Sequence, residues 1–216
     1  MKVLITGTTQ GIGKSIAELF LEKGHNVIGI DRLEKSIKHP NYIHYVCDIR
    51  DYDKLPKIED VNVLINNAGT QNEADIDINL KGAINITEHY ITPNIQSVLM
   101  IGSASAHTGA EFPEYAASKG GLLSYTKNVA MRIAEYGATC NSLDPGGVLT
   151  DLNKPVIENK ECWNEIMELT PLKRWATPEE IADWAYFLTV TNKFCTAQNI
   201  LVDGGEAAKF KFVWAE

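Results

Sequence analysis

The sequence predicts an α/β fold in which a doubly wound parallel sheet of about seven strands forms a single domain over residues 1–216. Apolar runs rich in Val, Ile and Leu alternate with segments of helical periodicity along the whole chain. Strands that are covered on both faces carry such continuous apolar runs. The runs lie at 2–6, 26–30, 42–47, 61–65, 97–102, 138–143 and 199–202.

Two helical segments carry signals for their ends. In 12–23 the apolar residues share one face and Gly24 follows as a stop. Residues 177–180, Thr-Pro-Glu-Glu, have the pattern of a capping box with proline at the first helical position. The stretch between the second and third strands is short, so its helix is at most vestigial. The apolar face of 12–23 consists of Ile12, Ile16, Leu19 and Phe20.

Length and charge exclude several classes of function. The 216 residues suffice for a sizeable core, and the net charge of −8 argues against nucleic-acid binding. Because no apolar run reaches the ~18 residues that span a bilayer, we expect a cytoplasmic protein without a membrane partner. The cysteines Cys47, Cys140, Cys162 and Cys195 are widely spaced, which predicts free thiols. No cluster has metal-ligand spacing, so we expect no metal.

A glycine loop, Gly7-x-x-x-Gly11-x-Gly13, separates the first strand from the following helix. Glycine lets the backbone approach a phosphate, which the helix N-terminus attracts with free N–H groups and a partial positive charge. Asp31 ends the second strand, where a carboxylate accepts hydrogen bonds from an adenosine ribose and repels a 2′-phosphate. Gln10 offers such a phosphate no charge, whereas Arg32 could accommodate one. We therefore predict a Rossmann-type site that prefers NAD to NADP.

Tyr115 and Lys119 are one helical turn apart and share a helix face. A free tyrosine titrates near ~10, which is too high for efficient proton transfer at neutral pH. An ammonium ~4 Å away, at an effective dielectric constant of ~20, stabilises the phenolate by about 4 kcal/mol and so brings the pKa of the phenol toward neutral pH. By itself, the pattern Tyr-x-x-x-Lys is more often found on a solvated helix face. It therefore indicates a catalytic pair only together with the surrounding motifs.

Together with further segments in the same order, these motifs resemble the short-chain dehydrogenase/reductase family in its simple single-domain branch. The resemblance extends over nearly the whole chain. It implies an NAD-dependent enzyme that interconverts a secondary alcohol and a ketone by hydride transfer. The matching segments are Asn66-Asn67-Ala68-Gly69, Ile78-Asn79-Leu80-x-Gly82, Asp144-Pro145-Gly146-Gly147-Val148-x-Thr150 and Val202-Asp203-Gly204-Gly205, with Asp48 after the third strand and Ser103 after the fifth.

The resemblance also implies roles for individual residues. Tyr115 would be the general acid and base, and Lys119 would lower its pKa and hold the nicotinamide ribose. Ser103, with Ser105 as its competitor for the role, would bind the substrate carbonyl, and Asn79 would position a water that links Lys119 to solvent. The cofactor would contact Gly7, Thr9, Gln10, Gly11, Ile12, Gly13, Asp31, Arg32, Asp48, Ile49, Asn67, Ala68, Gly69, Tyr115, Lys119, Pro145, Gly146, Val148 and Thr150.

Several segments lie outside these motifs. The stretch from Gly69 to Asn79 is shorter than in the family, so part of a helix or its preceding loop is missing. Residues 151–175 form a probable substrate lid, whose apolar residues either contact the substrate or pack onto their own domain. Residues 206–216 form a C-terminal tail that packs on its own subunit or on a neighbour. His107 either lines the site or has a surface role. The apolar lid residues are Val156, Ile157, Trp163, Met167, Leu169 and Trp175.

The helix after Lys119 carries two apolar stripes, and two stripes imply burial on more than one side. One stripe comprises Leu122, Thr126, Val129 and Ile133, and the other comprises Leu123, Ala130 and Ala134. Because related enzymes assemble through this helix, we expect a homodimer or homotetramer.

Other functions remain open. A non-catalytic dinucleotide-binding sensor would keep the fold without turnover. An NAD-retaining epimerase or dehydratase is disfavoured, because those relatives carry a larger C-terminal substrate region. An enoyl reductase is disfavoured because its tyrosine and lysine are usually spaced more widely.

Overall fold

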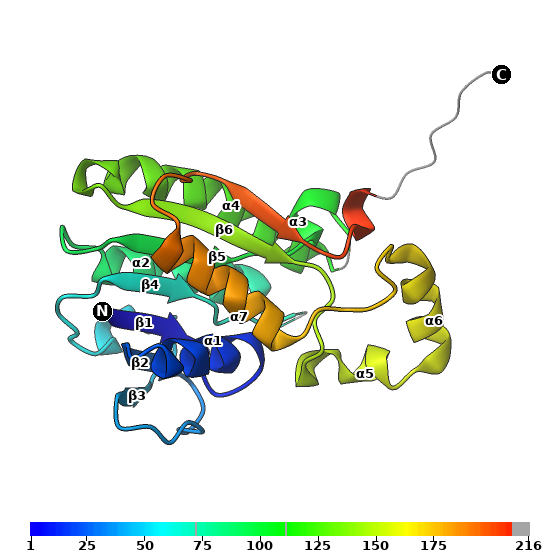
Figure 1. Cartoon of the computed structure of the whole chain (residues 1–216), viewed down its shortest axis with the longest axis horizontal. Coiled ribbons are helices and arrows are strands. Elements are labelled where there is room, and N and C mark those ends of the chain that lie inside the picture. The colour runs from blue at the N-terminus through cyan, green and yellow to red at the C-terminus, as the bar shows by residue number, and fades with distance from the viewer. Residues whose placement is uncertain (72, 111, 209–216) are drawn as a thin grey trace.

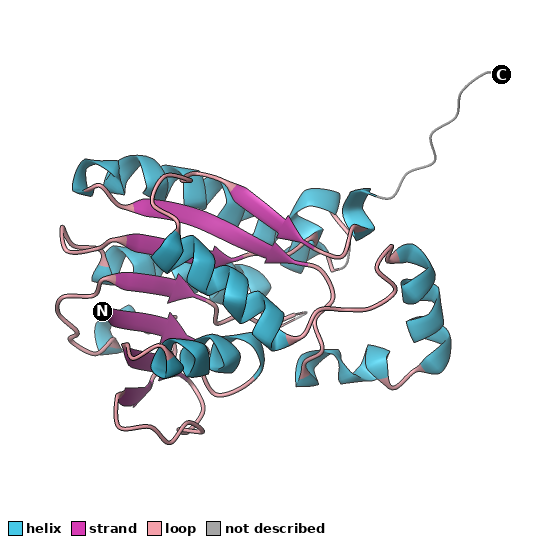
Figure 2. Cartoon of the chain, in the orientation of Figure 1, coloured by secondary structure: helices cyan, strands magenta, loops and turns pink. Residues whose placement is uncertain are grey.

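The computed structural model describes residues 1–71, 73–110 and 112–208 and confirms the predicted fold class. Seven strands form one sheet in the order β3-β2-β1-β4-β5-β6-β7, and all neighbouring pairs are parallel (Figures 1 and 2). The strands are β1 (Lys2–Thr6), β2 (Asn26–Asp31), β3 (Tyr42–Val46), β4 (Val63–Asn66), β5 (Ser97–Ile101), β6 (Thr139–Pro145) and β7 (Asn199–Val202).

Helices cover both faces of the sheet. On one face α1 (Gly11–Glu22) packs against α7 (Pro178–Tyr186), and Figure 1 shows the two side by side. The other face is covered by η2 (Ile76–Gly82), α2 (Ala83–Tyr90) and α4 (Pro113–Ile133). The remaining helical segments are η1 (Tyr52–Lys54), α3 (Ser105–Thr108), η3 (Ala134–Tyr136), η4 (Asp151–Asn153), α5 (Lys154–Ile157), α6 (Lys160–Leu169), η5 (Phe187–Thr191) and η6 (Glu206–Ala208).

Alternate residues of the strands feed two apolar cores. Val3 and Ile5 of β1 belong to the core that includes Phe20 of α1, whereas Leu4 belongs to the core that includes Val129 of α4. All five side chains are completely buried. Successive side chains of a strand point to opposite faces, so a continuous apolar run is what a strand between two helical layers requires.

The predicted helix signals are confirmed. Helix α1 ends at Glu22, and Gly24 has φ +80°, a left-handed conformation that glycine adopts without steric penalty. At the start of α7 the Thr177 hydroxyl accepts the N–H of Glu180 (3.3 Å), and the Glu180 carboxylate accepts the N–H of Thr177 (2.9 Å). The hydrogen bonds that Arg174 donates to Glu180 are the main reason that the pKa of this carboxyl falls to about 2.

The edge of the sheet at β3 lacks a covering helix. Residues 32–41, all of them described, contain no helix, as their length predicted. Consequently Ile43 and Val46 of β3 are more than half exposed.

Two other expectations concern the thiols and the membrane. The four cysteines are free, as predicted, and Cys140 is buried. None of the helices in the described ranges is long and apolar enough to cross a membrane.

Candidate active site

A cavity of about 800 Å³ lies where the strands end at their carboxyl termini. Its walls come from the residues that follow β1, β3, β4 and β5 and from the ends of β2 and β6. The strand order changes direction between β1 and β4, and ligands of open parallel sheets bind at such a switch point. The volume is in the range of small-molecule and cofactor sites.

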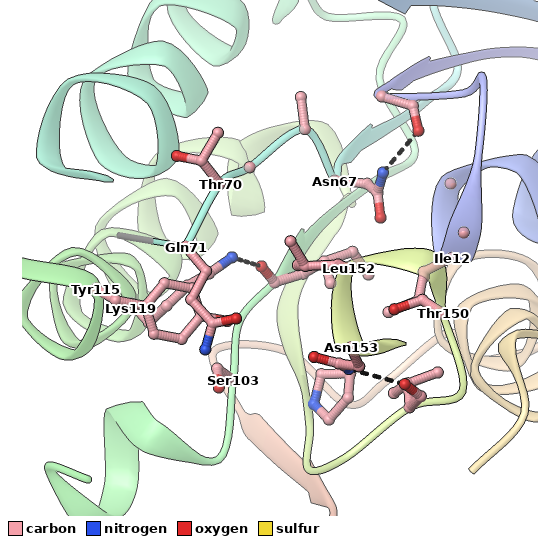
Figure 3. A pocket seen from close by; sticks show the side chains of 18 of the residues that line it. Ile12, Asn67, Thr70, Gln71, Ser103, Tyr115, Lys119, Thr150, Leu152 and Asn153 are labelled. Carbon is pink, nitrogen blue, oxygen red and sulfur yellow. Dashed lines mark hydrogen bonds between the residues drawn. The ribbon is translucent and has the colours of Figure 1, made fainter. Parts of the chain in front are cut away.

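The glycine loop forms a cradle that has no room for side chains. A Cβ added to Gly13 would lie 2.0 Å from the carbonyl oxygen of Gly7, and Gly7 itself has φ +74°. Asn67 secures the loop by donating hydrogen bonds to the carbonyl oxygens of Thr6 (2.9 Å) and Gly7 (3.0 Å), as Figure 3 shows in part. No side chain caps the first turn of α1. Its N–H groups can therefore meet a phosphate, so the loop fits the dinucleotide that the sequence predicts.

Asp31 lies at the wall of the cavity and is bonded to the loop. Its Oδ2 accepts hydrogen bonds from the backbone N–H (3.0 Å) and the hydroxyl (2.6 Å) of Thr9, and its Oδ1 accepts the N–H of Leu33 (3.0 Å). The residue is 8% exposed. The carboxylate therefore has a defined orientation at the position expected to meet the adenosine ribose.

Two arginines and a second carboxylate line the same part of the cavity. Arg50 forms a bidentate ion pair with Asp48, in which Nη2 lies 2.6 Å from Oδ2. This hydrogen bonding is the main cause that lowers the pKa of Asp48. Arg32 also lines the cavity, next to Asp31 in sequence, and its charge acts on Asp48. The wall thus carries both signs of charge.

Tyr115 and Lys119 line the cavity from α4. The Lys119 Nζ lies 5.7 Å from the centroid of the Tyr115 ring and donates a hydrogen bond to the carbonyl oxygen of Ile101 (2.9 Å), drawn as a dashed line in Figure 3. Lys119 is 5% exposed. A buried ammonium acts across a low local dielectric constant, so its charge reaches the phenol with little screening.

Two serines follow β5, and their hydrogen bonds distinguish them. Ser105 donates to the Oγ of Ser103 through its backbone N–H (3.2 Å) and its hydroxyl (3.1 Å). The Ser103 hydroxyl therefore keeps its own hydrogen for another acceptor. Both serines line the cavity.

Asn79 lies behind the cavity wall, within the π-helical segment η2. Its side chain accepts the N–H of Thr70 (2.8 Å) and donates to the carbonyl oxygen of Thr70 (3.0 Å) and to the hydroxyl of Ser118 (3.1 Å). A Cβ at Gly69 would meet the Asn79 Oδ1 at 2.9 Å and the Lys119 Nζ at 3.6 Å. Asn79 is therefore close to the lysine, although it does not line the cavity.

The remaining site residues named from the sequence gather in this one cavity. Sequence reasoning missed the wall residues Gln71 and Phe112, and it placed Leu152 and Asn153 in the predicted lid without naming them as contacts. Gln71, Leu152 and Asn153 are labelled in Figure 3, and the first comes from the shortened stretch after β4. The predicted cofactor residues that line the cavity are Gly7, Thr9, Gln10, Gly11, Ile12, Gly13, Asp31, Arg32, Asp48, Ile49, Asn67, Ala68, Gly69, Tyr115, Lys119, Pro145, Gly146, Val148 and Thr150.

The predicted lid, residues 151–175, forms η4, α5 and α6. Of its predicted apolar contacts, Val156 and Trp175 line the cavity. Trp163 instead packs edge-to-face against Trp175, with ring centroids 5.1 Å apart. Ile157, Met167 and Leu169 lie outside the lining of this cavity, and Leu169 is more than half exposed.

Other expectations concern the tail and α4. In the tail, Glu206 and Ala207 line the cavity, and residues 209–216 lie outside the described part of the chain. On α4 the stripe of Leu122, Thr126, Val129 and Ile133 is buried. The second stripe has no single environment, because Ala130 is buried, Leu123 is half-buried and Ala134 is exposed.

Comparison with known proteins places these observations in a family. A family model described as enoyl-(acyl carrier protein) reductase matches residues 7–206. The 3-oxoacyl-(acyl-carrier-protein) reductase FabG of Buchnera aphidicola is 30% identical over 233 positions, covering 93% of this chain and 95% of that protein. The L-rhamnose 1-dehydrogenase (NADP(+)) of Thermoplasma acidophilum is 30% identical, with 94% of each chain covered.

Solved structures agree. A short chain dehydrogenase family protein from Francisella tularensis has a TM-score of 0.85 at 28% identity, covering 96% of this chain and 99% of that one. The aldohexose dehydrogenase of Thermoplasma acidophilum has a TM-score of 0.87 at 25% identity, covering 100% and 97%. With its parallel sheet, its glycine cradle and its Tyr115–Lys119 pair, the chain belongs to the short-chain dehydrogenase/reductase family of oxidoreductases.

Proposed function

We propose that this protein interconverts a secondary alcohol and a ketone with NAD(H) as its cofactor. The observation that carries the proposal is the convergence of Ser103, Tyr115 and Lys119 with the glycine cradle in one cavity. A site that only binds a dinucleotide would not need an acid, its activating cation and a hydroxyl donor on the same wall.

Each of the side chains has a separate role in the reaction at the carbonyl oxygen. NADH, when bound, supplies a hydride to the carbonyl carbon. Tyr115 donates its phenolic proton to the carbonyl oxygen during reduction and takes a proton back during alcohol oxidation. Ser103 donates a hydrogen bond to the same oxygen and stabilises its developing negative charge. Lys119 stabilises the phenolate and holds the nicotinamide ribose, and Asn79 positions a water on the route from Lys119 to solvent.

The preference for NAD over NADP follows from Asp31. Its negative carboxylate lies in the cavity wall with its orientation set by Thr9 and Leu33, so it favours ribose hydroxyls and repels a 2′-phosphate. Arg32, which also lines the cavity, opposes this preference because its positive charge attracts a 2′-phosphate. The name of the Thermoplasma rhamnose dehydrogenase shows that a relative uses NADP(+). We assign NAD because the carboxylate is the better oriented of the two charges.

The substrate belongs among small carbonyl and hydroxyl compounds. The similar proteins are named for 3-oxoacyl groups and for sugars, both of which present a ketone or secondary alcohol equivalent to the enzyme. The spacing of four between Tyr115 and Lys119 favours this chemistry over enoyl reduction. Around the reacting groups the wall is mixed, with Phe112 and Val156 beside the amides of Gln71 and Asn153.

We also propose that the protein is a homodimer or homotetramer that uses the outer face of α4. This face carries the half-buried Gly120, where an added Cβ would meet nothing within 4 Å, and Met131, whose exposed fraction is 75%. Light scattering at working concentration tests this proposal, and a monomer would contradict it.

The activity is tested by following the absorbance of reduced nicotinamide with a panel of ketones and secondary alcohols, using each cofactor. We expect turnover with NADH to exceed turnover with NADPH. Tyr115→Phe removes only the phenolic oxygen, so we expect it to abolish turnover while leaving NADH binding intact. Turnover by that variant at the rate of the unaltered protein would refute the proposed chemistry. NADH binding without turnover of any substrate would favour a sensor, and turnover of a substrate without net change in the cofactor would favour an epimerase.

A further inference from the structure

Asp144 is a buried carboxylate that the proposed chemistry does not use. It lies in β6 directly before Pro145, and its exposed fraction is 0%. Its Oδ2 is 2.6 Å from the Nε2 of His107, whose side chain is 28% exposed and lies outside the cavity lining. Among the residues that the structure describes, none donates a hydrogen bond to its Oδ1. Burial of a carboxylate is costly unless it is paired, so the imidazole is an essential partner for Asp144.

The pair is part of a larger set of contacts around Ser103. The N–H of Gly102 donates to the carbonyl oxygen of Leu143 (2.8 Å), and the N–H of Ala104 donates to the carbonyl oxygen of Pro145 (2.8 Å). The Asp144 side chain, between these two residues of β6, holds His107. Leu143, Pro145 and Asp144 of β6 therefore hold Gly102, Ala104 and His107, respectively. Ser103 lies between the first two of these anchored residues.

Helix α3, which contains His107, needs such an anchor. It spans four residues, and a helix of this length is not stable without tertiary contacts. It begins at Ser105, which in turn donates two hydrogen bonds to the Ser103 oxygen. A shift of α3 would therefore move both the backbone of Ser103 and the donors that orient its hydroxyl.

The carboxylate also packs directly on the backbone beside Ser103. A Cβ added to Gly102 would lie 2.0 Å from the Asp144 Oδ1, so the carboxylate takes the space that any side chain at 102 would need. Burial raises the pKa of Asp144, whereas the hydrogen bond with His107 and the charge of Lys119 lower it.

We propose that Asp144 and His107 are positioning residues, which hold the Ser103 hydroxyl in register with the Pro145–Gly146 loop across the cavity. This inference rests on the proposed function. In the described part of the chain no hydrogen bond joins His107 to Ser103, so the pair acts through the backbone and through Ser105. A displacement of about 1 Å at a reacting group can cost about a hundredfold in rate. Substitution of His107 leaves β6, the Pro145–Gly146 loop and the glycine cradle in place, so we expect the binding of NADH to be unaffected.

Two amide substitutions of His107 test the pair. A glutamine side chain is long enough to donate a hydrogen bond from its amide to Asp144, whereas an asparagine side chain is too short. We expect His107→Asn to lower kcat at saturating NADH by about ten- to a hundredfold, and His107→Gln to stay within about threefold of the unaltered protein. The dissociation constant of NADH, measured by fluorescence, should stay within about twofold in both variants. His25→Ala is the control, because His25 contacts the N-terminus and Tyr186 instead of the site.

Hydrogen exchange provides a readout that does not depend on turnover. In His107→Asn the amides of residues 103–108 should exchange faster, and in His107→Gln and His25→Ala they should not. An unchanged kcat with unchanged exchange in His107→Asn would overturn the inference, and so would equal losses in the two amide variants. Activity in Tyr115→Phe would instead refute the proposed function, and the exchange measurement would then still decide whether His107 holds this segment.

Discussion

Replacement of Lys119 by methionine tests the electrostatic part of the proposed mechanism, because methionine keeps much of the length of the side chain and removes its charge. The Nζ lies 5.7 Å from the centroid of the Tyr115 ring. With the phenolate charge placed at the ring centroid and an effective dielectric constant of ~20, its attraction to the ammonium is about 3 kcal/mol. That free energy corresponds to about a hundredfold in the phenolate population at a given pH.

The assay is the pH dependence of kcat for alcohol oxidation at saturating NAD. The phenolate is the base in this direction, so the rate rises as Tyr115 loses its proton. Without the ammonium, the rising limb should move to higher pH, with a loss of about a hundredfold at pH 7 that shrinks as the pH increases. Lys119→Arg is the matched control because it keeps the charge. Thermal unfolding monitors the separate effect of leaving the carbonyl oxygen of Ile101 without its donor.

A loss of the same size at every pH would refute the electrostatic reasoning. It would mean that Lys119 acts by holding the cofactor and that its charge does not set the proton affinity of Tyr115. A shift of the pH profile that corresponds to about a hundredfold change in the phenolate population would instead support the electrostatic role of Lys119.

Three further predictions test other parts of the structure. Asp31→Asn should raise kcat/KM for NADPH relative to NADH by about tenfold, since it removes the repulsion of a 2′-phosphate while keeping a hydrogen-bond acceptor. Gly13→Ala should prevent NADH binding and lower Tm, because its Cβ would lie 2.0 Å from the carbonyl oxygen of Gly7. Glu180→Gln should lower Tm above pH 4.5, and the difference should vanish as the pH falls toward about 2, because the depressed pKa of Glu180 stabilises the fold only while the carboxyl is ionised.

The sheet could be predicted because each of its strands carries a local signature. Val3, Leu4 and Ile5 alternate between two cores, so all three must be apolar, and the same holds for the buried residues 63–65 of β4 and 98–101 of β5. The glycine cradle was equally local, since Gly7 and Gly13 are constrained by contacts within one loop and its neighbour. Signals of this kind need no knowledge of which segments meet in space.

The walls of the site could not be predicted in the same way. Asn153 donates to the carbonyl oxygen of Val148 (2.8 Å) and Gln71 enters from the shortened stretch after β4, and neither residue belongs to a motif. The contact between His107 and Asp144 joins residues that are 37 positions apart. Such contacts depend on how loops of given length leave the sheet, which periodicity does not encode.

The side chain of Asn79 secures the short connection between β4 and η2. The alignment with the Buchnera reductase runs over 233 positions but takes in only 93% of this chain, so that relative has residues that are absent here. Asn79 nevertheless lies close to Lys119, since both side chains approach Gly69. Asn79 belongs to the π-helical segment η2, and its side chain reaches Thr70 and Ser118. Three hydrogen bonds then hold its amide, two of them to the backbone of Thr70. The loop is thus closed by the side chain of Asn79 itself, so substitution of this residue should disturb the wall of the cavity as well as any water that it positions.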